Sequence, residues 1–170
     1  MASARMGEIV VSNDPNEELI ALGLGSCIGL AIVDRTAGVG GLAHIVLPES
    51  NDRSSQVGKF ADTAVPELIS RMHEAGAVQR RFETAIAGGA RMFEMSGGLD
   101  IGARNEAAVR SALAAAHLIV KAAKTGGTTG RTLKVTLSDL TVTVRSAGEP
   151  PETLLQGWAP RSTTTAGAAR

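Results

Sequence analysis

Short apolar runs rich in β-branched residues follow one another through the first third of the chain, with turn-forming residues between them. These runs are Glu8–Val11, Glu18–Leu24, Ile28–Asp34 and Val39–Leu47. Runs this short are typical of strands, because a helix of a folded domain usually needs roughly ten or more residues. The polar segment 34–38 predicts a hairpin between the third and fourth runs, and Pro48 ends the fourth.

The remaining pattern adds strands and two amphipathic helices. Further strands are predicted at 84–87, 132–137 and 140–145, the last two joined by a hairpin at Ser138-Asp139. One helix is predicted to start near Asp62–Thr63 and to end before Gly76. For the second helix we expect Asn105 as the N-cap, a buried stripe running from Val109 to Ala123, and an end at Gly126-Gly127. This mixture predicts an α+β or mixed α/β domain built in layers.

The composition limits how such a domain can be filled. The chain has 170 residues, of which 44% are hydrophobic but only 2% aromatic, so the core must be aliphatic. A chain of this length corresponds to one domain of about 100–200 residues. We expect a single domain over residues 1–160. Residues 161–170 are rich in Ser, Thr and small side chains, and we expect a disordered tail there.

Charge and hydropathy exclude several classes of function. The formal net charge is zero, which argues against a basic nucleic-acid surface and against a polybasic membrane patch. The N-terminal residues lack the apolar stretch of a signal peptide, and no run approaches the length of a transmembrane helix. We therefore expect a cytoplasmic protein without membrane insertion.

A single cysteine, Cys27, stands in a glycine-rich stretch, Gly23–Gly29. One cysteine permits no internal disulfide and no metal site made of several thiolates, and no metal or other cofactor is predicted. The glycine spacing differs by one from a dinucleotide fingerprint, and a strand follows where that motif needs a helix. The same following strand argues against the nucleophile elbow of an α/β-hydrolase.

Cys27 and His44 each allow a structural and a catalytic interpretation. A lone cysteine often only fills space in a core, and a histidine on a partly apolar strand face is often a hydrogen-bonded core residue. The catalytic interpretation pairs them across a sheet, where a neutral imidazole takes the thiol proton and generates the nucleophilic thiolate. Glycines beside Cys27 favour this interpretation, because they let a substrate approach the sulfur closely.

Six segments, taken together and in order, resemble the CheD family of chemoreceptor glutamine deamidases. They are Leu22–Cys27, Gly40–His44 with Leu47-Pro48, Phe60–Ala64, Gly88–Ala90 with Met92-Phe93, Ile101–Asn105, and Gly126–Arg131. The resemblance spans roughly residues 18 to 145. It implies two packed β-sheets flanked by helices, in a cysteine-hydrolase fold shared with bacterial toxin deamidases.

The resemblance also implies an activity and partners. The activity is hydrolysis of particular glutamines on methyl-accepting chemotaxis receptors to glutamate and ammonia, with Cys27 as nucleophile and His44 as general base. A tetrahedral oxyanion needs hydrogen-bond donors, and we expect backbone N–H groups around Ser26 and Cys27 to supply them. The expected substrate and oxyanion region comprises Gly25, Ser26, Gly41, Gly88 and Gly89. A CheC-type phosphatase is the implied regulatory partner.

One position departs from the family pattern. The third catalytic residue is usually a threonine six positions before the cysteine, and this chain has Ala21 there. Alanine offers no side-chain acceptor for the imidazole, although a backbone carbonyl or a water could serve instead. This departure motivates an alternative function, a catalytically weak module that binds a receptor or a phosphatase. A cysteine hydrolase acting on a non-receptor protein is a further alternative.

Overall fold

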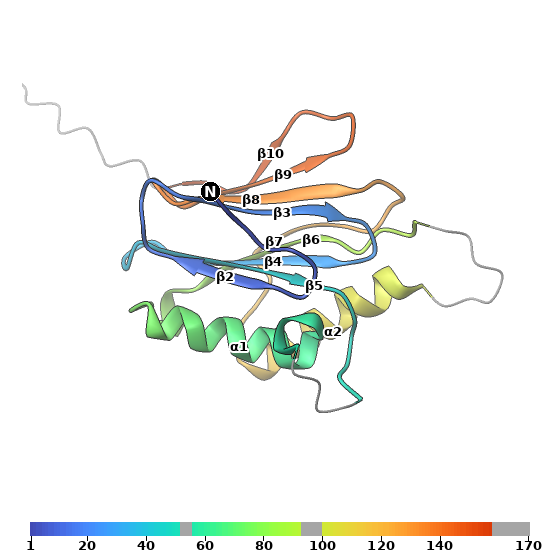
Figure 1. Cartoon of the computed structure of the whole chain (residues 1–170), viewed down its shortest axis with the longest axis horizontal. Helices are drawn as coiled ribbons and strands as arrows, with labels where there is room; N and C mark the ends of the chain where they lie inside the picture. The colour runs from blue at the N-terminus through green and yellow to red at the C-terminus, as the bar shows by residue number, and fades with distance from the viewer. Residues whose placement is uncertain (52–55, 93–99, 158–170) are drawn as a thin grey trace, which may run out of the picture.

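The protein has three layers: a sheet, a second sheet, and a pair of helices (Figure 1). The computed structural model describes residues 1–51, 56–92 and 100–157. The expected tail at 161–170 lies outside these residues, as does Phe93. The three layers confirm the predicted architecture of two packed sheets with helices. Both helices lie on the same side of the sheet pair.

The outer sheet has one buried face and one exposed face. Its strands lie in the order β1 (Ala2–Ser3), β3 (Glu18–Leu24), β8 (Arg131–Thr136), β9 (Thr141–Ser146) and β10 (Glu152–Leu155). All neighbours are antiparallel except β1 and β3. Along β8, Leu133 and Val135 enter the core between the sheets, whereas Lys134 faces outward and binds Glu18 at 2.9 Å. This alternation is what a half-buried antiparallel strand requires.

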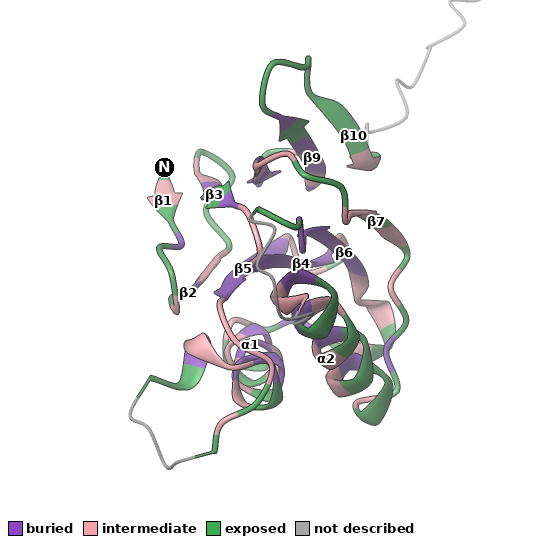
Figure 2. Ribbon diagram, turned by 90° about the vertical axis from the view of Figure 1, so that its right-hand side faces the viewer, coloured by how far each residue is buried: buried purple, intermediate pink, exposed green. Residues whose placement is uncertain are grey.

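The central sheet is covered on both faces. Its strands lie in the order β2 (Ile9–Ser12), β5 (Val39–Ile45), β4 (Ile28–Asp34), β6 (Glu83–Gly88) and β7 (Ala122–Thr125). Every residue of β4 and β5 is buried, as Figure 2 shows by colour. Ala31 and Val33 pack toward the outer sheet, and Leu30 and Ile32 pack toward the helices. Residues on both faces of these strands are therefore core residues, which explains their continuous apolar runs.

The two long helices are α1 (Ala61–Glu74) and α2 (Ile101–Ala115). Short 3₁₀ helices, η1 (Val57–Lys59) and η2 (Gln79–Arg81), flank α1 along the chain. α1 begins one residue before the predicted start and buries its apolar stripe, including Leu68 and Met72, against the central sheet. The prediction for this helix is confirmed.

The prediction for α2 was wrong at both ends. Asp100 is the N-cap and accepts a hydrogen bond from the Ala103 N–H at 3.0 Å, so Asn105 lies inside the helix. The helix ends at Ala115, and His117 then adopts a left-handed backbone with φ of 59°. Residues 122–125 form β7, parallel to β6, because pairing at the sheet edge satisfies backbone groups that a longer helix would have bonded internally.

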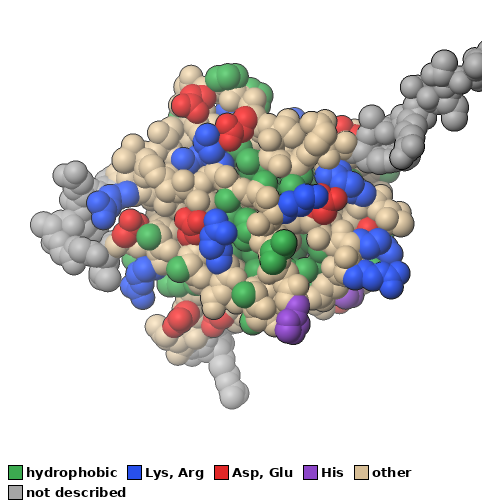
Figure 3. Space-filling view, turned by 180° about the vertical axis from the view of Figure 1, so that it is seen from behind, with side chains coloured by type: hydrophobic (Ala, Val, Ile, Leu, Met, Phe, Trp, Pro, Cys, Tyr) green, Lys and Arg blue, Asp and Glu red, His purple; other side chains and the backbone are tan. Residues whose placement is uncertain are grey.

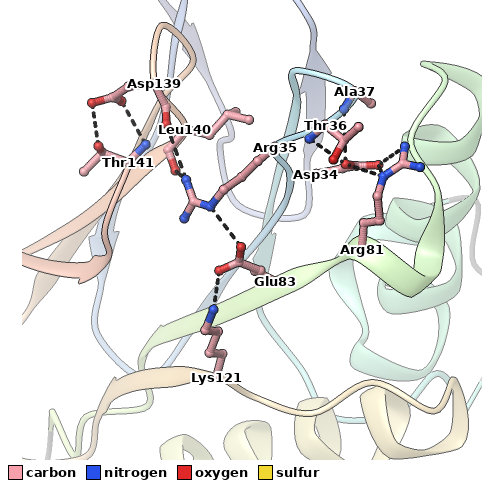
Figure 4. Close-up of polar contacts among 10 residues, drawn as sticks. All are labelled: Asp34, Arg35, Thr36, Ala37, Arg81, Glu83, Lys121, Asp139, Leu140 and Thr141. Atoms are coloured by element: carbon pink, nitrogen blue, oxygen red, sulfur yellow. Dashed lines mark hydrogen bonds and ion pairs between the residues drawn. The ribbon is translucent and has the colours of Figure 1, made fainter. Parts of the chain in front are cut away.

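Ionic contacts gather where β4 turns into β5, at the end of the sheet pair (Figure 4). The carboxylate of Asp34 is fully buried and accepts hydrogen bonds from Arg81 Nε at 2.9 and 3.1 Å. Arg35 donates to Glu83 at 2.9 Å and to the carbonyl of Leu140 at 3.0 Å. Because Leu140 belongs to the β8–β9 hairpin, Arg35 joins the two sheets at this end.

The surface carries charges of both signs. Figure 3 shows acidic and basic side chains interspersed over one face of the molecule, in keeping with the net charge of zero. Within the described ranges, no helix has the length and apolarity to cross a membrane.

Candidate active site

Cys27 and His44 lie on the same face of the central sheet, the face that packs against the outer sheet. Cys27 immediately precedes β4, and His44 is the sixth residue of β5. Gly29 is directly opposite His44 in the ladder, and residues two apart on a strand share a face. Cys27 comes one residue before the last pair of this ladder, Ile28 opposite Ile45, and its side chain belongs to the core between the two sheets. The catalytic pairing of Cys27 with His44 stays a prediction.

His44 is nearly fully buried, and its two ring nitrogens have different surroundings. Nδ1 lies 3.1 Å from the carbonyl oxygen of Ala4. A carbonyl can only accept a hydrogen bond, so Nδ1 carries the proton. Nε2 is buried without a hydrogen-bond partner among the described residues. In this tautomer Nε2 presents its lone pair and is the ring atom free to take a proton.

The acceptor for His44 comes from the residue that follows β1, beside Ala21. β1 runs parallel to β3, with Ser3 opposite Ile20, and the Ala4 N–H donates to the carbonyl of Ile20 at 2.8 Å. Continuing this register places Ala4 next to Ala21, which is fully buried in the core between the sheets. The backbone of Ala4 thus supplies a hydrogen-bond acceptor to the imidazole although Ala21 has none.

Burial sets the protonation of both groups. Burial lowers the pKa of His44 below its ordinary 6.5, and this effect exceeds the opposing ones of the Ala4 carbonyl and the charge of Glu8. Burial also raises the pKa of the Cys27 thiol above 9.0, against a smaller opposing effect from its own backbone N–H. Near pH 7 both groups are therefore neutral, and the pair rests as thiol and imidazole.

Hydrogen bonds fix the loop that carries Cys27. Each of three successive carbonyls has a donor: Gly25 accepts from Ala90 N–H at 2.8 Å, Ser26 from Asn105 Nδ2 at 2.9 Å, and Cys27 from Gly89 N–H at 2.9 Å. In a trans peptide the C=O and the following N–H point in opposite directions. The N–H groups of Ser26 and Cys27 therefore point away from Ala90 and Asn105 respectively.

The residues predicted for the substrate and oxyanion region fall into three groups. Gly25 and Ser26 line, with Cys27, a cavity of about 280 Å³ that Met92 and Ile101 also border. Gly88 and Gly89 lie beneath the loop: at Gly88, where φ is +111°, a Cβ would overlap the carbonyl oxygen of Cys27.

Gly41 lies apart from this group. A Cβ there would lie 2.7 Å from atoms of Leu68 and Met72, so its open side faces α1, on the opposite face of β5 from His44.

Residues that sequence reasoning missed surround the same site. Ala4 gave no signal, because every residue carries a backbone carbonyl. Asn105 stands in a recognised motif but was interpreted as a helix cap, whereas its side chain is fully buried and bonds to the Cys27 loop. Within the described ranges, no three His, Cys, Asp or Glu side chains are grouped to hold a metal ion.

Sequence comparisons with known proteins agree with the family resemblance of the motifs. A sequence model of the family described as CheD chemotactic sensory transduction matches residues 46–146. A Symbiobacterium thermophilum protein named probable chemoreceptor glutamine deamidase CheD is 42% identical over 149 residues, covering 84% of this chain and 90% of that protein.

Two further relatives come from other organisms. The Thermotoga maritima chemoreceptor glutamine deamidase CheD is 40% identical over 143 residues, covering 84% of this chain and 90% of that protein. A Methanococcus vannielii protein named probable chemoreceptor glutamine deamidase CheD is 42% identical over 147 residues, covering 85% and 94%. The similarity thus extends over most of both chains in each pair.

Proposed function

Since this chain belongs to the CheD family, we propose that it is a glutamine deamidase acting on chemoreceptors by a Cys27–His44 mechanism. The relatives named above carry this activity in their names. The observation that carries the mechanism is the state of His44: Nδ1 is bonded to Ala4, and Nε2 is buried without a partner among the described residues, on the face that bears Cys27.

In the first step the thiol of Cys27 attacks the glutamine amide. The S–H proton passes to Nε2 of His44 as the Sγ–Cδ bond forms, which gives a tetrahedral oxyanion. His44 then returns that proton to the amide nitrogen, the Cδ–N bond breaks, and ammonia leaves. The product of this step is a thioester between Cys27 and the former glutamine side chain.

In the second step water hydrolyses the thioester. Nε2 of His44 takes a proton from the water as its oxygen attacks the thioester carbon, and the Sγ–Cδ bond then breaks. The proton returns to the sulfur, and glutamate is released. Because the resting pair is neutral, His44 acts as a general base during attack and no stored ion pair is needed.

Backbone donors for the oxyanion are proposed at Ser26 and Cys27. The carbonyls of Gly25 and Ser26 are held by Ala90 and Asn105, which turns the next N–H groups the other way. Donors fixed in this way are pre-oriented for the charge that develops in the transition state.

Mass spectrometry of a receptor cytoplasmic fragment tests this function. The wild type should convert specific glutamines to glutamate, whereas C27A should convert none and C27S almost none, with the fold retained. A folded wild type that binds the fragment but releases no ammonia would favour the interaction module instead. Turnover on another protein only would favour a non-receptor substrate.

Partners and location are part of the same proposal. We propose that the protein acts in the cytoplasm on receptor coiled coils and that a CheC-type phosphatase binds it. A pull-down with the purified phosphatase tests the second partner, and C27A should bind as the wild type does, because the thiol is nearly buried. No association at micromolar concentrations would remove this partner.

A further inference from the structure

We propose that Asn105 is a positioning residue that holds the loop of Cys27 and the strand of His44 in fixed relation. The proposal deepens the proposed function and rests on it in taking Cys27 and His44 as the reacting pair. It does not depend on which protein supplies the glutamine.

The side-chain amide of Asn105 bridges the two segments that carry this pair. Its Nδ2 donates to the carbonyl of Ser26 and to the carbonyl of Val46, each at 2.9 Å. Ser26 immediately precedes Cys27, and Val46 follows His44 by two residues. One nitrogen on α2 therefore contacts both the nucleophile loop and the residue that directly follows the strand of the general base.

The two hydrogen bonds of Asn105 lie just beyond the end of the ladder between β4 and β5. The β4–β5 ladder ends at the pair Ile28 and Ile45. Beyond this pair the two segments would be joined by no further rung, and Asn105 joins them there instead. Cys27 thus lies between the last rung of the ladder and the amide bridge.

An amide side chain suits the position between the two carbonyls. Asparagine there carries two energetic penalties, so packing alone does not explain its presence. The NH₂ group has two hydrogens in a fixed plane, so it satisfies two carbonyls at once. An apolar side chain could fill this buried position without placing an unpaired polar atom in the core. In contrast, Oδ1 of Asn105 is buried with no hydrogen-bond partner among the described residues. Asparagine is also a poorer helix former than leucine or alanine.

Loss of the bridge should act on the proton transfer between the pair. Transfer needs the thiol within hydrogen-bond reach of Nε2, and a displacement of about 1 Å can lower a rate by about 100-fold. With Asn105 removed, the Cys27 loop is still held by Ala90 and Gly89, but beyond the last rung of the ladder no side chain joins the loop to Val46.

Alkylation of Cys27 by iodoacetamide measures this coupling directly. The chain has one cysteine, so intact mass reports this thiol alone. Rates are measured from about pH 5 to about pH 9, the range in which histidine titrates. The wild type should show a step that follows deprotonation of His44, and H44A should lack that step. N105A should lose it as well, with a rate near neutral pH lower by about 10- to 100-fold.

V109A is the matched control. Val109 lies one turn further along α2, is fully buried, and belongs to the core between helix and sheet. Its truncation lowers stability without touching the bridge, so V109A should keep the wild-type pH profile. N105L keeps the branching and the number of heavy atoms of the side chain but replaces both polar atoms with methyl groups, which provides a second variant if N105A does not fold.

The outcomes separate this proposal from the proposed function. An N105A or N105L protein with the wild-type alkylation profile overturns the positioning role, and so does a V109A protein that loses the step equally. If N105A loses the step while the wild type deamidates no receptor glutamine, the positioning role stands and the receptor substrate is wrong. If the wild type and H44A have the same alkylation profile, the positioning role of Asn105 and the proposed Cys27–His44 mechanism are both overturned.

Discussion

The imidazole of His44 is hydrogen-bonded to the backbone of Ala4, with 3.1 Å between Nδ1 and the carbonyl oxygen. This bond joins the central sheet to the N-terminal segment and leaves Nε2 on the unbonded side of the ring. Because the acceptor is a backbone atom in register with Ala21, the alanine at position 21 does not leave the ring without an orienting partner.

Replacing Ala21 with threonine, the usual residue of the family at this position, should therefore give no gain in deamidase activity. Nδ1 carries one hydrogen, which the Ala4 carbonyl already accepts. Ala21 is fully buried, so the larger side chain of A21T should lower the free energy of unfolding by about 1–3 kcal/mol. Deamidation kinetics and urea denaturation measure the two effects. A21V has the same shape without the hydroxyl, and a tenfold higher kcat/KM for A21T than for A21V would contradict the prediction.

His44 should make stability depend on pH. Its folded-state pKa is lowered below 6.5, mainly by burial, so the unfolded chain binds more protons between the two values. The contribution is complete above pH 6.5 and is lost as the pH falls through the folded-state pKa. Denaturation of the wild type and H44L across this window should show the dependence in the wild type only. NMR titration of the ring giving a pKa above 6.5 would refute it.

Gly88 and Gly25 should respond differently to an added methyl group. At Gly88 the methyl meets the rigid carbonyl of Cys27 in a left-handed backbone, so G88A should displace the loop and abolish turnover. At Gly25 it meets the flexible Met92 side chain at 2.8 Å, so G25A should fold normally and raise KM by narrowing the cavity. Thermal melting and kinetics distinguish the two, and a fully active G88A would refute the first.

Asp34 should be the main ionic determinant of stability. Burial raises the pKa of this carboxyl, but hydrogen bonds from Arg81, Val78 and Ala37 outweigh it and hold the pKa below 3.8. Its contribution is therefore present above pH 3.8 and lost as the pH falls through the folded-state pKa. D34N should lower the free energy of unfolding at pH 7 by about 3 kcal/mol, because donors then face an NH₂ group.

A surface pair provides the comparison for Asp34. Glu67 binds Arg71 at 2.7 Å on the outside of α1, where both side chains are partly exposed. E67Q should change the free energy of unfolding by less than about 1 kcal/mol. Equal losses for D34N and E67Q in chemical denaturation would show that burial of Asp34 does not set its contribution.

The sequence pattern correctly predicted the elements whose hydrogen bonds join residues close together in the sequence. The hairpins at 34–38 and 138–139 and the helix α1 lie where the sequence placed them. α2 was predicted too late and too long, because the stripe from Val109 continues at helical spacing into residues that pair with β6. Pairing of β7 with a strand more than 30 residues earlier is not visible in any local window.

The sequence by itself determined the layered fold class and the aliphatic core and predicted Cys27 and His44 as the reactive groups, because periodicity and residue chemistry are carried by the residues themselves. Only the tertiary structure decided what surrounds those groups. The acceptor for His44 is a backbone carbonyl of Ala4, and the bridge to the Cys27 loop is the amide of Asn105. Both contacts join residues about 40 or more positions apart, and packing of the layers, which no local pattern encodes, brings them within hydrogen-bond distance.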